Sequence, residues 1–142
     1  MKKYFRYVAL CLVLSIFMSN VSLAVSEDAI TLSNASDAFV QTSHTSDLDT
    51  DTGLYIYAAD VIAKSGATST YVSCVIQRRE NGEFVNVPGA WLSDSQSGRF
   101  AAVGGQRYVY KGYWYRTQAT YIVHINGQEY KIVNNSDQYW YN

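Results

Sequence analysis

Two Asn-Gly dipeptides constrain the fold of this chain most strongly. They are Asn81-Gly82 and Asn126-Gly127, and each stands between two runs in which polar and apolar residues alternate. A type I′ turn needs a positive φ at both central residues, which Asn and Gly adopt readily, and such turns join the strands of tight β-hairpins. The sequence therefore predicts one hairpin from residues 71–79 and 83–87 and a second from residues 113–125 and 128–133.

The register of each hairpin follows from counting outward from its turn. The first turn pairs Arg79 with Phe84 and Ile76 with Val87, and the second pairs His124 with Glu129 and Val123 with Tyr130. Because side chains alternate between the two faces of a strand, each hairpin has one apolar face. We expect these core faces to carry Val72, Cys74, Ile76, Val85 and Val87 in the first hairpin and Tyr113, Tyr115, Ala119, Tyr121, Val123, Tyr130 and Ile132 in the second.

Further alternating runs predict strands at residues 54–63, 99–103 and 106–110, with Gly104-Gly105 separating the last two. No segment keeps a helical period of apolar residues. Six to seven short antiparallel strands in about 90 residues are typical of an all-β fold. We expect a small antiparallel β-sandwich, with a small β-barrel as the alternative.

The first 24 residues have the pattern of a signal peptide. Lys2, Lys3 and Arg6 precede an apolar run at 8–18, and small residues at Ser22 and Ala24 predict cleavage after Ala24. The apolar run is shorter than the roughly 20 residues that span a membrane. We therefore expect a secreted, extracellular protein with no membrane anchor after signal cleavage.

The part of the chain after the signal peptide divides near Gly53. Residues 25–52 contain six acidic residues, no Lys or Arg, and no apolar periodicity. Such a composition buries too little apolar surface to offset the entropy of ordering. We predict a flexible acidic leader at 25–52 and a β-sandwich domain at 53–142. The balanced net charge of −1 argues against a nucleic-acid partner.

Several short motifs together resemble a known group of proteins. They are the run 76–78, the Asn-Gly turn after it, Phe84, Trp91, and the run 109–116, which reads Val-Tyr-Lys-Gly-Tyr-Trp-Tyr-Arg. Over about residues 54–141 the chain is similar to small exported proteins of Gram-positive bacteria that have an immunoglobulin-like β-sandwich and no assigned function. The resemblance implies an immunoglobulin-like fold and export, and it brings no catalytic residues. Tyr113 resembles the tyrosine corner of such sandwiches.

The residues that commonly carry chemistry are few and scattered. Cys74 lies in a run of aliphatic residues, which favours a buried thiol over a nucleophile. Residues 47–53 alternate acidic oxygens like a calcium loop, but Gly53 stands seventh where an EF-hand needs it sixth. The chain has two histidines, His44 and His124, and no zinc-site spacing. We expect no catalysis, no metal and no cofactor.

Aromatic residues are the one type in excess, with sixteen in residues 53–142. Alternation places Trp114, Arg116, Gln118, His124 and Glu129 together on the polar face of the second hairpin, and these are the candidate ligand-binding residues. Aromatic rings flanked by polar groups suit sugar rings and protein surfaces alike. We expect a non-catalytic binding module for a glycan, a cell wall or a protein. The alternatives are a self-associating structural surface protein and a secreted bacteriocin-like toxin.

Overall fold

The computed structural model describes residues 35–142, which form eight β-strands after one short 3-10 turn, η1 (Ser36–Ala38). The predicted signal peptide at 1–24 lies outside the described residues. No helix in the described part is long and apolar enough to cross a membrane. The strands are β1 (Phe39–Asp49), β2 (Leu54–Ala63), β3 (Ala67–Glu80), β4 (Glu83–Ser97), β5 (Phe100–Tyr108), β6 (Tyr113–Ile125), β7 (Gln128–Asn135) and β8 (Tyr139–Tyr141).

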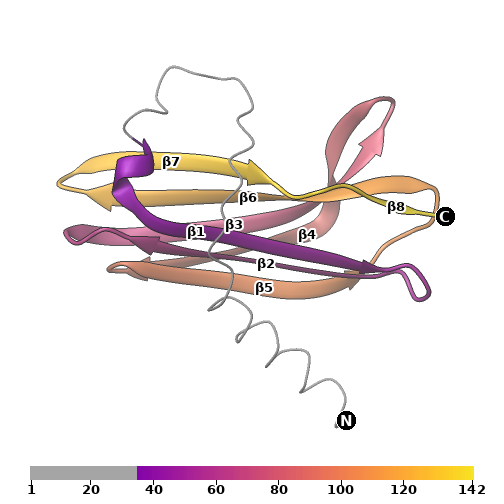
Figure 1. Ribbon diagram of the computed structural model, residues 1–142, viewed down its shortest axis with the longest axis horizontal. Helices are drawn as coiled ribbons and strands as arrows, with labels where there is room; N and C mark the ends of the chain where they lie inside the picture. The colour runs from indigo at the N-terminus through magenta and orange to yellow at the C-terminus, as the bar shows by residue number, and fades with distance from the viewer. Residues whose placement is uncertain (1–34) are drawn as a thin grey trace, which may run out of the picture. The chain divides into compact units, whose positions relative to one another are not determined.

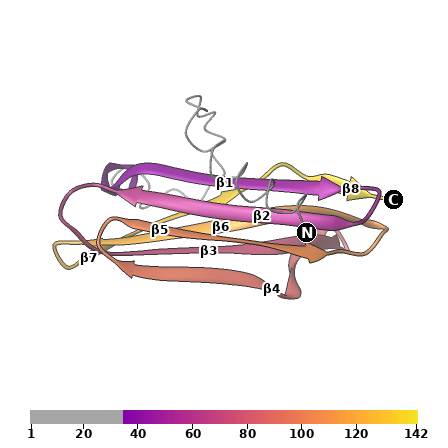
Figure 2. The same cartoon turned by 90° about the horizontal axis from the view of Figure 1, so that it is seen from below.

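The strands form two antiparallel sheets that pack face to face. One sheet has the order β1-β2-β5, and the other has the order β4-β3-β6-β7, with β8 also pairing with β6. Figures 1 and 2 show the long strands of both sheets lying along nearly the same direction. This is the predicted β-sandwich and not the alternative barrel. Its eight strands exceed the six to seven predicted, because β1 and β8 were not recognised.

The strand pairings are those of an immunoglobulin-like sandwich. β2 pairs with β5, β3 with β6, and β6 with β7, as strands B and E, C and F, and F and G do in that fold. The tyrosine corner is present, but Tyr115 forms it instead of the predicted Tyr113. The Tyr115 hydroxyl donates to the carbonyl oxygen of Tyr110 at 2.7 Å and accepts from the Tyr110 amide at 3.1 Å.

The hairpin turns are confirmed, and so is most of the register. Asn81 and Asn126 have φ of 51° and 53°, and the glycine after each also has a positive φ. His124 pairs with Glu129, Val123 with Tyr130, and Arg79 with Phe84, as predicted.

The predicted pairing of Ile76 with Val87 is wrong, because β4 contains a bulge. Gln77 pairs with Asn86 but Val75 pairs with Trp91, so residues 87–90 stand outside the ladder. Gly89 in this bulge has a φ of 69°, which favours glycine. Beyond the bulge β4 continues to Ser97, ten residues past the predicted end.

The core is rich in tyrosine. The largest fully buried side chains include Tyr55, Tyr115 and Tyr121, which pack with Val72, Ile76 and Val123. Val85 was predicted to join this core but is exposed. It lies on the β3–β4 hairpin, whose end projects from the sandwich in Figure 1. The other sheet therefore does not cover it.

Strand β5 is continuous where two strands were predicted. It passes through Gly104 and Gly105 without a break. A Cβ atom at Gly104 would lie 3.2 Å from the Ala58 Cβ, and one at Gly105 would lie 2.7 Å from Leu92 Cδ1. These glycines permit the close approach of β5 to its neighbours rather than a turn.

The predicted flexible leader is wrong for residues 39–49, which form β1. β1 pairs with β2 from Phe39 to Asp49. Tyr121 and Tyr139 reach across from the other sheet, and their hydroxyls donate to the carbonyls of Ser43 and Ser46, each at 2.7 Å. β1 is thus held by backbone pairing and tyrosine hydroxyls rather than by an apolar stripe, which is why composition misled. Residues 25–34 of that prediction lie outside the described residues.

Candidate functional site

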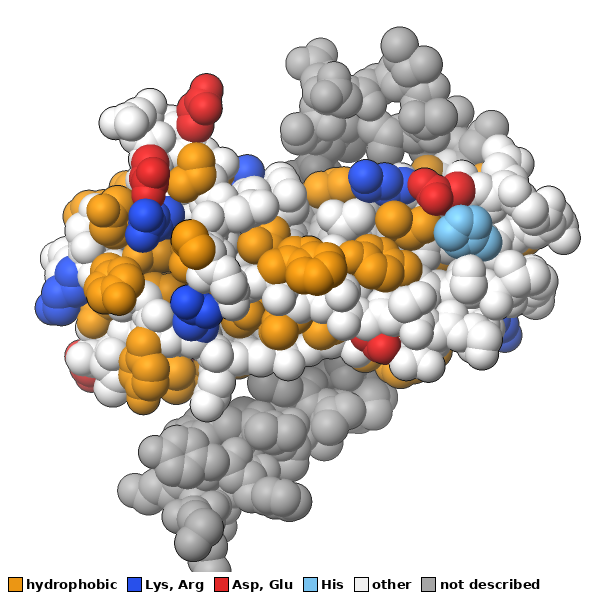
Figure 3. Space-filling view, turned by 180° about the vertical axis from the view of Figure 1, so that it is seen from behind, with side chains coloured by type: hydrophobic (Ala, Val, Ile, Leu, Met, Phe, Trp, Pro, Cys, Tyr) orange, Lys and Arg blue, Asp and Glu red, His pale blue; other side chains and the backbone are white. Residues whose placement is uncertain are grey.

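The candidate site lies on the outer face of the β4-β3-β6-β7 sheet, which we call the outer face. Strand β6 alternates as predicted, with Tyr115, Thr117, Ala119 and Tyr121 buried. Trp114, Arg116, Gln118 and His124 alternate with them and point outward. Apolar side chains gather in the middle and at one end of this face (Figure 3).

Three tryptophans are exposed here. Trp114 is 41% exposed, Trp140 is 42% exposed, and Trp91 is 56% exposed. Trp114 and Trp140 are directly opposite each other in the β6–β8 ladder, and their ring centroids are 5.6 Å apart at 44°. Trp91 reaches the same face through the β4 register after the bulge, where it pairs with Val75.

A polar chain of side chains lies beside these tryptophans. Arg116 Nε donates to Gln77 Oε1 at 2.8 Å, and Gln77 Nε2 donates to Asn86 Oδ1 at 2.9 Å. The Arg116 guanidinium also stacks on Phe84, with its central carbon 4.1 Å from the ring centroid. Gln77 is only 6% exposed, so packing holds in place both hydrogen bonds of its side-chain amide.

These contacts fix Arg116 while leaving hydrogen-bond donors of its guanidinium available. Partial burial lowers the pKa of Arg116 from its ordinary value, but an arginine stays charged in proteins. The bond to Gln77 uses Nε–H, and the guanidinium carries four more N–H groups on its terminal nitrogens. We call Phe84, Trp91, Trp114, Arg116 and Trp140, with the supporting Gln77 and Asn86, the aromatic cluster.

The five predicted site residues do not lie together in the structure. Trp114 and Arg116 belong to the aromatic cluster, and Gln118 donates to Asn135 Oδ1 at 3.2 Å. His124 lies ten residues along β6 from Trp114, about 30 Å away at the rise of a β-strand. There its Nε2 is 3.4 Å from Glu129 Oε2 and its Nδ1 is 3.1 Å from Ser69 Oγ.

Five members of the aromatic cluster were not predicted as site residues: Phe84, Trp91, Trp140, Gln77 and Asn86. Gln77 and Asn86 are directly opposite in the predicted hairpin register, so their pairing could have been found from the Asn-Gly turn. Trp91 could not be placed, because its face depends on how many residues the bulge removes from the ladder.

The residues considered for chemistry have structural roles. Asp49 closes the β1–β2 turn, where its Oδ1 accepts from the Asp51 amide at 2.9 Å and its Oδ2 accepts from Thr52 Oγ1 at 2.7 Å. The hydrogen bond from the Thr52 hydroxyl has the largest effect on the pKa of Asp49, and together these bonds lower it. Burial raises the pKa of Cys74 to about 12, which makes it a poor nucleophile. Residues 35–142 contain no group of three His, Cys, Asp or Glu that could hold a metal ion.

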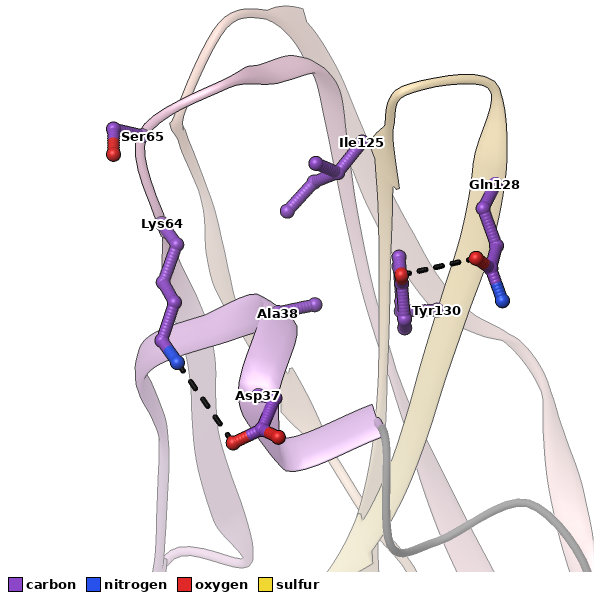
Figure 4. A pocket seen from close by; sticks show the side chains of 7 residues that line it. All are labelled: Asp37, Ala38, Lys64, Ser65, Ile125, Gln128 and Tyr130. Carbon is purple, nitrogen blue, oxygen red and sulfur yellow. Dashed lines mark hydrogen bonds and ion pairs between the residues drawn. The ribbon is translucent and has the colours of Figure 1, made fainter.

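A pocket of about 320 Å³ opens at the η1 end of the sandwich (Figure 4). Asp37 and Lys64 face each other across one side at 3.8 Å, and on the other side Tyr130 donates to Gln128 Oε1 at 3.1 Å. Both members of the ion pair are largely exposed, where such pairs contribute little.

No protein-family model matches this chain, and neither a curated protein nor a solved structure matches it.

Proposed function

We propose that this protein is an exported, non-catalytic binding module that uses the aromatic cluster to bind a glycan at a cell surface. The observation that carries the proposal is the presence of three exposed tryptophans on the same sheet face as a fixed arginine. A contiguous patch of exposed apolar side chains often marks a surface that another molecule covers. Export is inferred from the N-terminal sequence pattern and from the resemblance to small exported proteins of Gram-positive bacteria.

The chemistry of the cluster suits a sugar. The C–H face of a pyranose ring stacks on an indole ring, and its hydroxyl groups take hydrogen bonds from nearby donors. Trp114 and Trp140 offer two such rings beside each other. The terminal N–H groups of Arg116 and the amide of Asn86 offer donors alongside them.

The cluster is also organised in advance of binding. The stack on Phe84 and the bond to Gln77 hold Arg116 in one conformation. Trp114 and Trp140 lie on paired β-strands rather than on loops. A side chain that is already ordered loses less entropy when a ligand binds, which favours affinity.

The test is a pull-down on glycan arrays and isolated cell walls with residues 25–142, which contain every described core residue of the sandwich. Trp114→Ala should weaken saturable binding about 30-fold, as removal of a central aromatic anchor costs about 2 kcal/mol. Phe100→Ala is the matched control, because Phe100 is an aromatic residue on β5, in the other sheet, and is more exposed than Trp114. It should leave binding unchanged.

Three results would count against the proposal. Absence of glycan or cell-wall binding by the unmodified chain would exclude it. Oligomers that grow with concentration in sedimentation and disappear in Trp114→Ala would assign the cluster to self-association instead. Leakage of lipid vesicles caused by the purified protein would favour the toxin alternative.

A further inference from the structure

A second hollow lies at the end of the sandwich where the β4 bulge meets the segment between β5 and β6. It is a pocket of about 240 Å³ lined by Arg78, Val87, Pro88, Tyr115 and residues 107–110. At about 30 Å³ per molecule of liquid water it has room for about eight waters, enough for one six-membered ring. None of these lining residues belongs to the aromatic cluster.

Hydrogen bonds fix two walls of this pocket. Arg107 Nη1 donates to the carbonyl of Gly89 at 2.7 Å, which ties β5 to the β4 bulge. A Cβ atom on Gly89 would lie 3.2 Å from that same nitrogen, so the guanidinium packs directly on the glycine. On the other side, the Tyr115 hydroxyl holds both backbone groups of Tyr110. Bulges that re-aim side chains in this way are common beside binding sites.

The pocket carries an excess of positive charge. Two of its lining side chains, Arg78 and Arg107, bear guanidinium groups. Glu80 is paired with Arg78 through Nε, which offsets one of the two charges. Arg78 also lies over the Tyr113 ring, 4.9 Å from its centroid, and this stack limits the motion of the guanidinium. Planar guanidinium groups with free terminal N–H groups recognise a carboxylate through two parallel hydrogen bonds.

The rest of the lining is aromatic and aliphatic. Tyr108 is 69% exposed and Tyr110 is 76% exposed, and Val87 and Pro88 contribute aliphatic surface. Tyrosine rings of this kind stack on the C–H face of a sugar while their hydroxyl groups remain hydrated. The lining thus combines a place for an anion with a place for a ring.

We propose that this pocket binds a sugar acid, with its carboxylate on Arg78 and Arg107 and its ring against Tyr108 and Tyr110. The site is separate from the aromatic cluster, and the inference does not depend on the proposed function of that cluster. Its ligand class is narrower, because a neutral sugar would supply no carboxylate to Arg107, whose side-chain bond goes to the neutral carbonyl of Gly89.

The experiment is an NMR titration of ¹⁵N-labelled residues 25–142 with glucuronate, and with glucose and acetate as partial probes. Glucuronate should shift the Gly89 amide and the arginine Nε–H signals with a dissociation constant of about 1 mM, typical of one small ring. Glucose lacks the carboxylate and acetate lacks the ring, so each should bind at least about tenfold more weakly.

Arg107→Gln should weaken glucuronate binding about tenfold, and Tyr110→Ala should weaken it as well. Arg99→Gln is the matched control, because Arg99 also lies beside β5 and its Nε donates to a backbone carbonyl, that of Ala63, at 2.9 Å. It should bind as the unmodified chain does.

Equal binding of acetate and glucuronate would refute the ring contact, and equal binding of glucose and glucuronate would refute the carboxylate contact. Binding that is unchanged in Arg107→Gln would place the ligand elsewhere. Trp114→Ala separates this site from the aromatic cluster, because it should leave the glucuronate affinity intact even if the cluster proves to bind nothing.

Discussion

The hydroxyl of Tyr121 offers a direct measure of how firmly β1 is attached to the sandwich. Tyr121 is fully buried on β6, and its hydroxyl donates to the Ser43 carbonyl on β1 at 2.7 Å. Burial raises the pKa of Tyr121 from its ordinary value, so the hydroxyl stays neutral and acts as the donor. Tyr121→Phe removes this one bond and keeps the ring. A lost bond of about 1 kcal/mol, with the cost of an unpaired, partly buried carbonyl, sums to about 1.5 kcal/mol.

For a domain of this size that loss lowers the melting temperature by about 6 °C. Thermal unfolding followed by circular dichroism measures it, and hydrogen exchange of the β1 amides shows whether this strand is released first. Tyr110→Phe is the control, because Tyr110 is largely exposed and removal of a hydroxyl at such a position changes stability by about 0.5 kcal/mol at most. If Tyr121→Phe melts together with Tyr110→Phe, the bond to Ser43 does not hold β1, and the account of that strand given above fails.

Two further predictions concern stability. Gly53 has a φ of 75°, and a Cβ atom there would lie 2.7 Å from the Tyr141 hydroxyl oxygen; we expect Gly53→Ala to destabilise the fold by about 1–3 kcal/mol in urea unfolding, and by more than Gly82→Ala, which has a φ of 92° and open space. The pKa of His44 is lowered in the folded state, chiefly by burial. Between the ordinary histidine pKa of 6.5 and the lower folded-state pKa, His44 therefore binds more protons in the unfolded chain than in the folded chain. Stability should therefore fall as the pH is lowered from about 7.5 through 6.5 toward the folded-state pKa, and an equal slope in His44→Asn would contradict this.

The fold was largely predictable from the sequence because its local signals agree with its tertiary structure. Asn81-Gly82 and Asn126-Gly127 fix two turns, and a fixed turn fixes both register and face. This reasoning placed Trp114 on the outer face correctly. It failed at residues 87–90, since a bulge depends on contacts with a strand that is distant in sequence, here the bond from Arg107 to Gly89.

The candidate site was only partly predictable, for reasons that differ from residue to residue. Trp114 and Arg116 could be placed by alternation along one strand. His124 and Glu129 share that face, yet strand length separates them from Trp114, which alternation alone does not reveal. The attachment of β1 could not be predicted from composition, because its anchors are hydroxyl groups on Tyr121 and Tyr139 and not apolar residues within β1.

The tyrosine bonds to β1 also bear on the order in which the chain folds. Ser43 and Tyr121 are 78 residues apart, and Ser46 and Tyr139 are 93 residues apart. Contacts between such distant residues raise the contact order, and a high contact order slows folding because a long loop must close first. These bonds cannot form until β6 and β8 are in place, so β1 has to wait for strands that lie far along the chain. We therefore expect an intermediate in which the two later hairpins are formed and β1 is still undocked, with the backbone edge of β2 open to pairing with other chains.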